Sequence, residues 1–60
     1  MTFKIGDKVP IKEFFTWYEG KIYAVKDWYY EVEANGHSHF LNETEISDLK
    51  NRFNKENNTQ

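Results

Sequence analysis

The sequence predicts a small all-β protein of four to five antiparallel strands, and three observations lead to this prediction. Asn35-Gly36, a dipeptide suited to a two-residue type I′ turn, lies between two runs rich in aromatic and branched residues. Apolar and polar residues alternate in several short segments, as they do in half-buried strands. The 60 residues include no cysteine but five Phe, four Tyr and two Trp, so large rings must supply the core of a single domain.

The central hairpin is predicted to join Trp28–Ala34 to His37–Asn42. A two-residue turn fixes the register, so that Ala34 faces His37, Val32 faces His39 and Tyr30 faces Leu41. Side chains alternate between the faces of a sheet. One face is therefore expected to carry Tyr30, Val32, His39 and Leu41, and the other Tyr29, Glu31, Phe40 and Asn42.

The first strand is predicted at Asp7–Lys12, after a turn signal at Gly6-Asp7. Val9 and Ile11 alternate there with polar residues, as on a half-buried strand. Pro10 cannot donate a ladder hydrogen bond, so this segment is an edge strand or is broken at that point.

The segment Glu13–Gly20 is predicted to be a loop that carries four aromatic residues, and Gly20 opens the second strand. A second, weaker turn signal at Lys26-Asp27 would join Lys21–Val25 to Trp28. If that turn has two residues, Tyr23 shares the face of Tyr30 and Leu41, whereas Ile22 and Ala24 share the face of Tyr29 and Phe40.

The sequence of residues 43–53 is consistent with two different secondary structures. Asn42 with Glu45 three positions later resembles a helix start, and Ile46, Leu49 and Phe53 recur at helical spacing. Alternatively, residues 43–47 form a 3₁₀ turn and Asp48–Phe53 is a fifth strand that closes a barrel. The folded domain is expected to span residues 1–53, and residues 54–60 are expected to be a disordered polar tail.

Four segments resemble small SH3-like barrels of the Tudor, chromo-barrel and KOW type: residues 3–9 (FKIGDKV), 17–22 (WYEGKI), 30–36 (YEVEANG) and 45–49 (EISDL). The chain is also similar to short proteins of low-GC bacteria and their phages that use this barrel. The resemblance implies a non-enzymatic binding module. Tudor and chromo-barrel domains hold methylated Lys or Arg in an aromatic cage, whose walls would correspond to Trp17 or Tyr18 and to Tyr29 or Tyr30.

The charge pattern gives little indication of a nucleic-acid or membrane surface. The formal net charge is −2, with acids and bases interspersed. No apolar run has the length of a signal peptide core or a membrane span. We therefore expect a complete, soluble, cytoplasmic protein.

The aromatic residues have two interpretations, as core or as a binding surface. Val9, Ile22, Tyr30, Val32 and Leu41 are predicted to be core. The predicted binding surface is centred on the aromatic loop and consists of Phe15, Trp17, Tyr18, Tyr29 and Phe40. We expect a protein or peptide partner, and a monomer or weak homodimer. The alternative is a nucleic-acid-binding barrel that uses lysines and stacked rings.

Catalysis and metal binding have no supporting motif. His37 and His39 lie on one strand face, but the sequence indicates no third ligand for zinc and has no cysteine. Ser38 points to the face opposite these histidines, so it forms no nucleophile–base pair with them. We therefore expect no enzyme activity and no cofactor.

Overall fold

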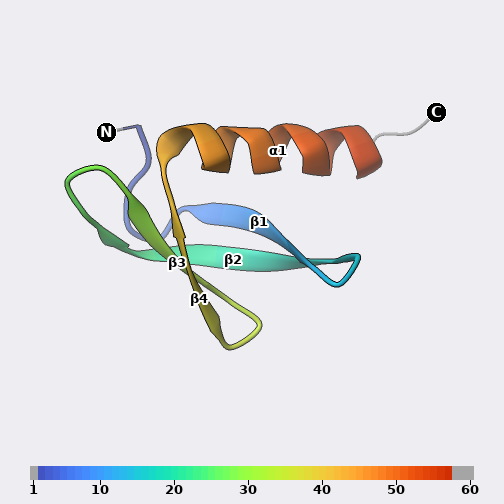
Figure 1. The fold of residues 1–60 in the computed structure, drawn as a ribbon, viewed down its shortest axis with the longest axis horizontal. Helices are drawn as coiled ribbons and strands as arrows, with labels where there is room; N and C mark the ends of the chain where they lie inside the picture. Colours follow the sequence, from blue (N-terminus) through green and yellow to red (C-terminus); the bar gives the residue numbers. More distant parts are fainter. Residues whose placement is uncertain (1, 58–60) are drawn as a thin grey trace.

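Four antiparallel strands form one sheet in chain order, and a C-terminal helix lies along it (Figure 1). The computed structural model describes residues 2–57. The elements are β1 (Lys8–Glu13), β2 (Thr16–Val25), β3 (Tyr30–Ala34), β4 (His37–Leu41) and α1 (Glu43–Asn57). The mainly β, antiparallel fold is thus as predicted. Barrel closure is not part of it, because β1 and β4 are the two edges of the described sheet.

The β3–β4 hairpin confirms the prediction made from Asn35-Gly36. Both turn residues have positive φ, 53° and 76°. The predicted register holds along the whole hairpin, from Ala34 opposite His37 to Tyr30 opposite Leu41. Asn and Gly accept this left-handed conformation at low cost, and the turn then determines every cross-strand pair that follows.

The predicted loop at Glu13–Gly20 is instead the tip of a second hairpin. Glu13 pairs with Thr16, and Phe14 and Phe15 form the turn with φ of 49° and 69°. Phe-Phe lacks the Gly or Asn that usually marks such a turn, so the sequence concealed it. Strand β2 therefore begins at Thr16, four residues before the predicted start at Gly20.

The β2–β3 connection differs from the predicted two-residue turn. Residues 26–29 lie between the strands, and the N–H of Lys26 donates to the carbonyl of Tyr29 at 2.8 Å. The register shifts between Ile22 and Ala24, which is the signature of a bulge. As a result Ile22 pairs with Val32 on the core face, whereas the Tyr23 hydroxyl reaches Ser38 on the other face; both predicted placements were wrong.

The core lies between the concave face of the sheet and α1. Its buried members are Val9, Ile11, Ile22, Tyr30, Val32, Ala34 and Ile46. Four of the five predicted core residues are among them, and the fifth, Leu41, is half-buried against them. Gly20 permits close packing of this layer, since a Cβ at this position would lie 2.8 Å from the side chain of Val32.

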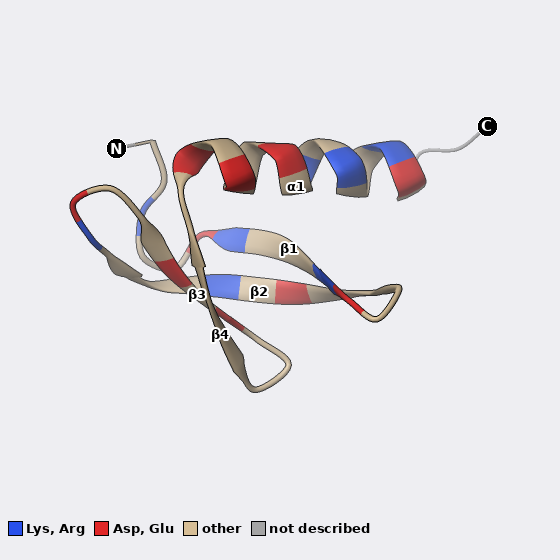
Figure 2. Cartoon of the chain, in the orientation of Figure 1, with Lys and Arg blue, Asp and Glu red and all other residues tan. Residues whose placement is uncertain are grey.

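Residues 43–53 form a helix, so the alternative of a fifth strand is wrong. The Asn42 side chain accepts from the N–H of Glu45 at 2.8 Å, and Glu45 accepts from the N–H of Asn42 at 2.9 Å, which is a capping box. Ile46 is fully buried. Acidic residues occupy the first turn of α1 and Lys55 the last, the arrangement that the helix dipole favours (Figure 2).

Helix α1 continues beyond the predicted domain end. Residues 54–57, expected to belong to a disordered tail, are helical, while residues 58–60 lie outside the described part of the chain. The carboxylate of Glu56 gives this last turn a tertiary contact, because it accepts from both Lys12 and Trp17. In the described residues, α1 is neither long nor apolar enough to cross a membrane.

The N-terminal segment is attached to the start of α1 through Tyr30. The buried Tyr30 hydroxyl donates to Glu43 at 2.6 Å, and Glu43 also accepts from the N–H of Thr2 at 2.7 Å. The hydrogen bond from Tyr30, followed by those from Thr2, holds the pKa of Glu43 below its ordinary value. Burial and the bond to Glu43 raise the pKa of Tyr30. These contacts tie three chain segments together at one point.

Candidate functional site

The five residues predicted to form one binding surface lie in four different places. Only Tyr29 and Phe40 are brought together, with ring centroids 5.8 Å apart. Phe15 is at the tip of the β1–β2 hairpin, and Trp17 and Tyr18 lie on opposite faces of β2. The segment Glu13–Gly20 is a hairpin whose alternation separates its rings, so these residues do not form one continuous surface.

Tyr29 and Phe40 belong to an aromatic cluster whose third member is Trp28. The Trp28 and Tyr29 rings are 4.7 Å apart at an interplanar angle of 59°. Trp28 and Phe40 are 73% and 65% exposed, so this cluster is surface and not core. We call these three residues the aromatic cluster. Trp28 and Tyr29 come from the β2–β3 connection, and Phe40 comes from the outer face of β4.

A shallow hollow of about 280 Å³ borders the aromatic cluster. Besides the three rings, it is lined by Asn42 and Glu45, the two residues of the helix capping box. Because the capping hydrogen bonds restrain both side chains, the Glu45 carboxylate is held beside the rings. The site therefore combines three aromatic rings with a negative charge that the helix cap holds in place.

Sequence reasoning missed Trp28 because it assigned this residue to a strand. The signal that could have found it is its position directly after the turn signal Lys26-Asp27. A ring in a short connection lacks the alternation that buries strand residues, and loops at the surface often carry binding residues. Glu45 was noted only as a capping residue, since its approach to Phe40 depends on the angle between β4 and α1.

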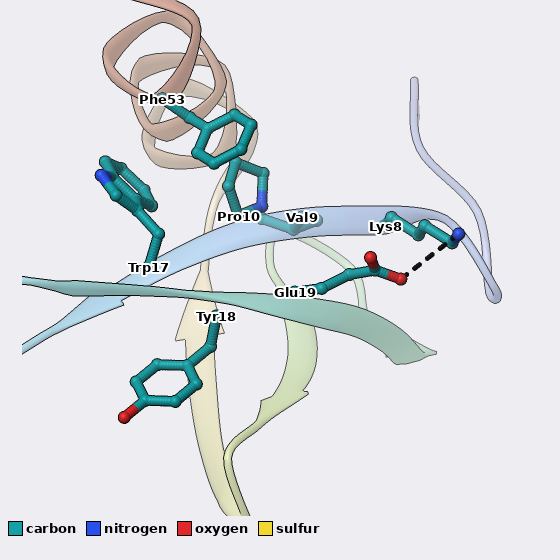
Figure 3. Close-up of a pocket in the computed structure, with 7 residues that line it drawn as sticks. All are labelled: Lys8, Val9, Pro10, Trp17, Tyr18, Glu19 and Phe53. Carbon is teal, nitrogen blue, oxygen red and sulfur yellow. Dashed lines mark ion pairs between the residues drawn. The ribbon is translucent and has the colours of Figure 1, made fainter. Parts of the chain in front are cut away.

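Trp17 fastens the C-terminal half of α1 to the β1–β2 hairpin (Figure 3). Its ring packs edge-on against Phe53 with centroids 5.3 Å apart, and its Nε1–H donates to Glu56 at 2.8 Å. Lys12 places its ammonium 5.5 Å from the Trp17 ring centroid and also contacts Glu56 at 3.1 Å. The hydrogen bonds from Trp17 and then Lys12 lower the pKa of Glu56. Trp17 thus has a structural role, in agreement with the core interpretation of the aromatic residues.

A second groove, of about 350 Å³, lies beside Trp17. Pro10 and Phe53 line it together with Trp17, and the ion pair of Lys8 with Glu19, 3.3 Å long, lies at its border. Tyr18 points to the opposite side of the sheet in Figure 3, where it is half-buried against the core.

The turn residues Phe14 and Phe15 are the most exposed large apolar side chains described, at 94% and 93%. Both are separated from the aromatic cluster by the length of the sheet, as Figure 1 shows for the two ends of β2. Phe15 therefore does not contribute to the same site as Tyr29 and Phe40.

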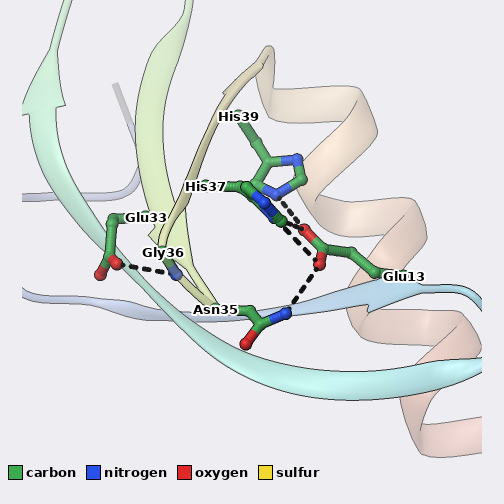
Figure 4. A network of polar contacts seen from close by, with 6 residues as sticks. All are labelled: Glu13, Glu33, Asn35, Gly36, His37 and His39. Atoms are coloured by element: carbon green, nitrogen blue, oxygen red, sulfur yellow. Dashed lines mark hydrogen bonds and ion pairs between the residues drawn. The ribbon is translucent and has the colours of Figure 1, made fainter.

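Glu13 connects the end of β1 to both histidines of β4 (Figure 4). Its Oε2 lies 2.8 Å from Nε2 of His39 and 3.2 Å from Nδ1 of His37, and Asn35 donates to Oε1 at 3.3 Å. Burial by itself would raise the pKa of Glu13, but the hydrogen bonds from Asn35 and the histidines outweigh it and lower that pKa. Within residues 2–57, no three His, Cys, Asp or Glu side chains are arranged to hold a metal ion.

Comparison of the chain with protein-family models, curated proteins and solved structures gave no match.

Proposed function

We propose that this protein is a non-catalytic binding module that recognises a protein or peptide through the aromatic cluster. The observation that supports this proposal is that Trp28 and Phe40 remain 73% and 65% exposed while packing against Tyr29. The seven buried core residues form a contiguous core without them. Rings that stabilise little in the free protein, grouped on one surface, are the residues that most often dominate protein interfaces.

The chemistry of the site favours a cationic side chain of the partner. Aromatic faces attract Lys and Arg through their ring quadrupoles, and the Glu45 carboxylate at the edge of the hollow adds a complementary charge. Glu31 lies opposite Phe40 on the same outer face and increases the negative potential there. An extended basic peptide is the ligand class that fits this surface, in line with the cage that the family resemblance implies.

Nucleic-acid binding has less support. Three of the five lysines in the first half of the chain form ion pairs within the molecule: Lys4 with Asp7, Lys8 with Glu19 and Lys12 with Glu56. Figure 2 shows blue and red segments interleaved along the sheet, whereas phosphate binding favours basic residues concentrated together.

Selection of a random peptide library on the immobilised protein tests the proposal. The wild type should enrich sequences that contain Lys or Arg, and Trp28→Ala should bind the enriched peptides about tenfold more weakly. Phe14→Ser is the matched control, because it removes an even more exposed ring far from the cluster and should keep the affinity.

Three outcomes would contradict the proposal: no enrichment over Trp28→Ala, an equal loss in Phe14→Ser, or enrichment of acidic peptides. Binding of a random single-stranded oligonucleotide at comparable affinity would favour the nucleic-acid alternative.

A further inference from the structure

The two edges of the sheet differ in which backbone groups face outward. Next to a two-residue turn, the flanking residues form a hydrogen-bonded pair, and every second residue then directs its N–H and C=O away from its ladder partner. The turns at residues 14–15 and 35–36 fix this parity in both edge strands. The outward residues are Lys8, Pro10 and Lys12 in β1, and Ser38 and Phe40 in β4.

The β1 edge carries features that prevent strand addition. Pro10 occupies an outward position and has no N–H to offer, and lysines occupy the outward positions on both sides of it. Helix α1 also packs along this strand, where Lys12 pairs with Glu56 at 3.1 Å. Proline, lysine and a covering helix are the usual ways in which proteins protect an edge.

The β4 edge has none of these features. Its five residues, His37–Leu41, include no proline and no Lys, Arg, Asp or Glu. Within residues 2–57, the backbone groups of Ser38 and Phe40 make no backbone hydrogen bond outside the sheet and helix ladders. The next outward N–H, that of Asn42, is already bound by Glu45 at 2.9 Å. The free edge is therefore short and neutral, and it is limited to two residues.

We propose that β4 is a dimerisation edge, at which a second copy of this chain adds its own β4 in antiparallel orientation. In such a pair Ser38 bonds to the partner's Phe40 and Phe40 to the partner's Ser38, so the edge is complementary to itself around His39. Each copy carries a net charge of −2, but no carboxylate belongs to the pairing strand itself, and the Glu13 carboxylate beside His39 is engaged in hydrogen bonds with His39 and Asn35 of its own chain. The 65% exposed Phe40 ring then loses contact with water against the partner strand.

The dimer and the proposed ligand surface share Phe40, but they differ in their other residues. In the dimer, the two aromatic clusters lie on the same outer face of a continuous sheet, and neither Trp28 nor Glu45 is part of the pairing edge. Ser38→Pro and Trp28→Ala therefore test the two proposals separately, and failure of one proposal would not by itself contradict the other.

Sedimentation analysis at rising protein concentration, up to about 1 mM, tests the dimer. The wild type should shift from the mass of one chain to that of two. Ser38→Pro removes the outward N–H without interrupting the ladder to β3, and it should remain monomeric. Ser38→Ala is the matched control: like Ser38→Pro it loses the 3.1 Å hydrogen bond from Tyr23, but it keeps the N–H and should dimerise.

Amide hydrogen exchange of the wild type provides a readout that does not depend on any variant folding. The amides of Ser38 and Phe40 should exchange about tenfold or more slowly at the highest concentration, while that of His39, already in the ladder, should change little. A one-chain mass at every concentration, a dimer that persists in folded Ser38→Pro, or unprotected Ser38 and Phe40 amides in a dimer would each overturn the proposal.

Discussion

Exchanging the residues of the two hairpin turns should change stability in opposite directions. Phe14 and Phe15 adopt nearly the same left-handed conformation, with φ of 49° and 69°, as Asn35 and Gly36, with φ of 53° and 76°. Only Asn and Gly tolerate this region well. The two phenyl rings are 94% and 93% exposed, so they bury too little surface to offset the free-energy cost of the left-handed backbone. Phe14→Asn combined with Phe15→Gly should therefore stabilise the fold.

The expected gain follows from the two positions separately. A left-handed conformation costs an L-residue roughly 1–2 kcal/mol, and Gly at position 15 removes this cost. The greater conformational freedom of Gly in the unfolded chain offsets about 0.5–1 kcal/mol of this gain in stability. Asn at position 14 adds a part of the same relief, so the net gain is about 1 kcal/mol. For a domain of this size, that corresponds to a rise in melting temperature of roughly 4–8 °C.

Thermal unfolding followed by circular dichroism measures the effect, with Asn35→Phe plus Gly36→Phe as the reciprocal variant. The reciprocal variant should lose about 1–2 kcal/mol, because it places strained residues in the turn that fixes the central register. If Phe14→Asn plus Phe15→Gly melts at or below the wild-type temperature, the strain argument is refuted, and the rings must make stabilising contacts in solution.

Three further predictions concern the core, the acid response and the two tryptophans. Gly20→Ala should destabilise by about 1–3 kcal/mol in chemical denaturation, because its methyl group would meet a valine side chain at 2.8 Å. In the folded state the pKa of Glu43 lies below its ordinary value of 4.5, so as the pH falls the unfolded state takes up this proton first. The free energy of unfolding should therefore decrease as the pH is lowered below 4.5, and Glu43→Gln should flatten that part of the pH profile. Trp17→Ala should cost about 2 kcal/mol through the lost packing on α1, whereas Trp28→Ala should cost about 1 kcal/mol or less; equal costs in the same melting assay would contradict this assignment of roles.

Local signals predicted the parts of the fold that local chemistry determines. Asn35-Gly36 specifies a turn by itself, and the register of β3 with β4 follows from it. The capping pair of Asn42 and Glu45 likewise marks the start of α1 within four residues. The choice between helix and fifth strand was left open by the sequence, since Ile46, the only buried residue of α1, has no partner nearby in the chain.

The missed hairpin depends on contacts that the sequence does not reveal. The Phe14–Phe15 turn has no conformational preference of its own, and it forms because β2 gains ladders to β1 on one side and β3 on the other. The site was predicted in part for the same reason. Strand alternation placed Phe40 on the outer face beside Tyr29, but the position of Trp17 depends on a helix residue that lies far away in the chain.

Strand β4 carries three roles in five residues because side chains and backbone groups alternate along it. His39 and Leu41 face the core, where His39 contacts Glu13. Phe40 faces outward into the aromatic cluster, and the backbone of Ser38 and Phe40 forms the free edge. Phe40 therefore belongs to both proposed surfaces, and a change at this residue alone would not separate them. Ligand recognition is instead assigned through Trp28 and self-association through Ser38, each of which belongs to only one surface.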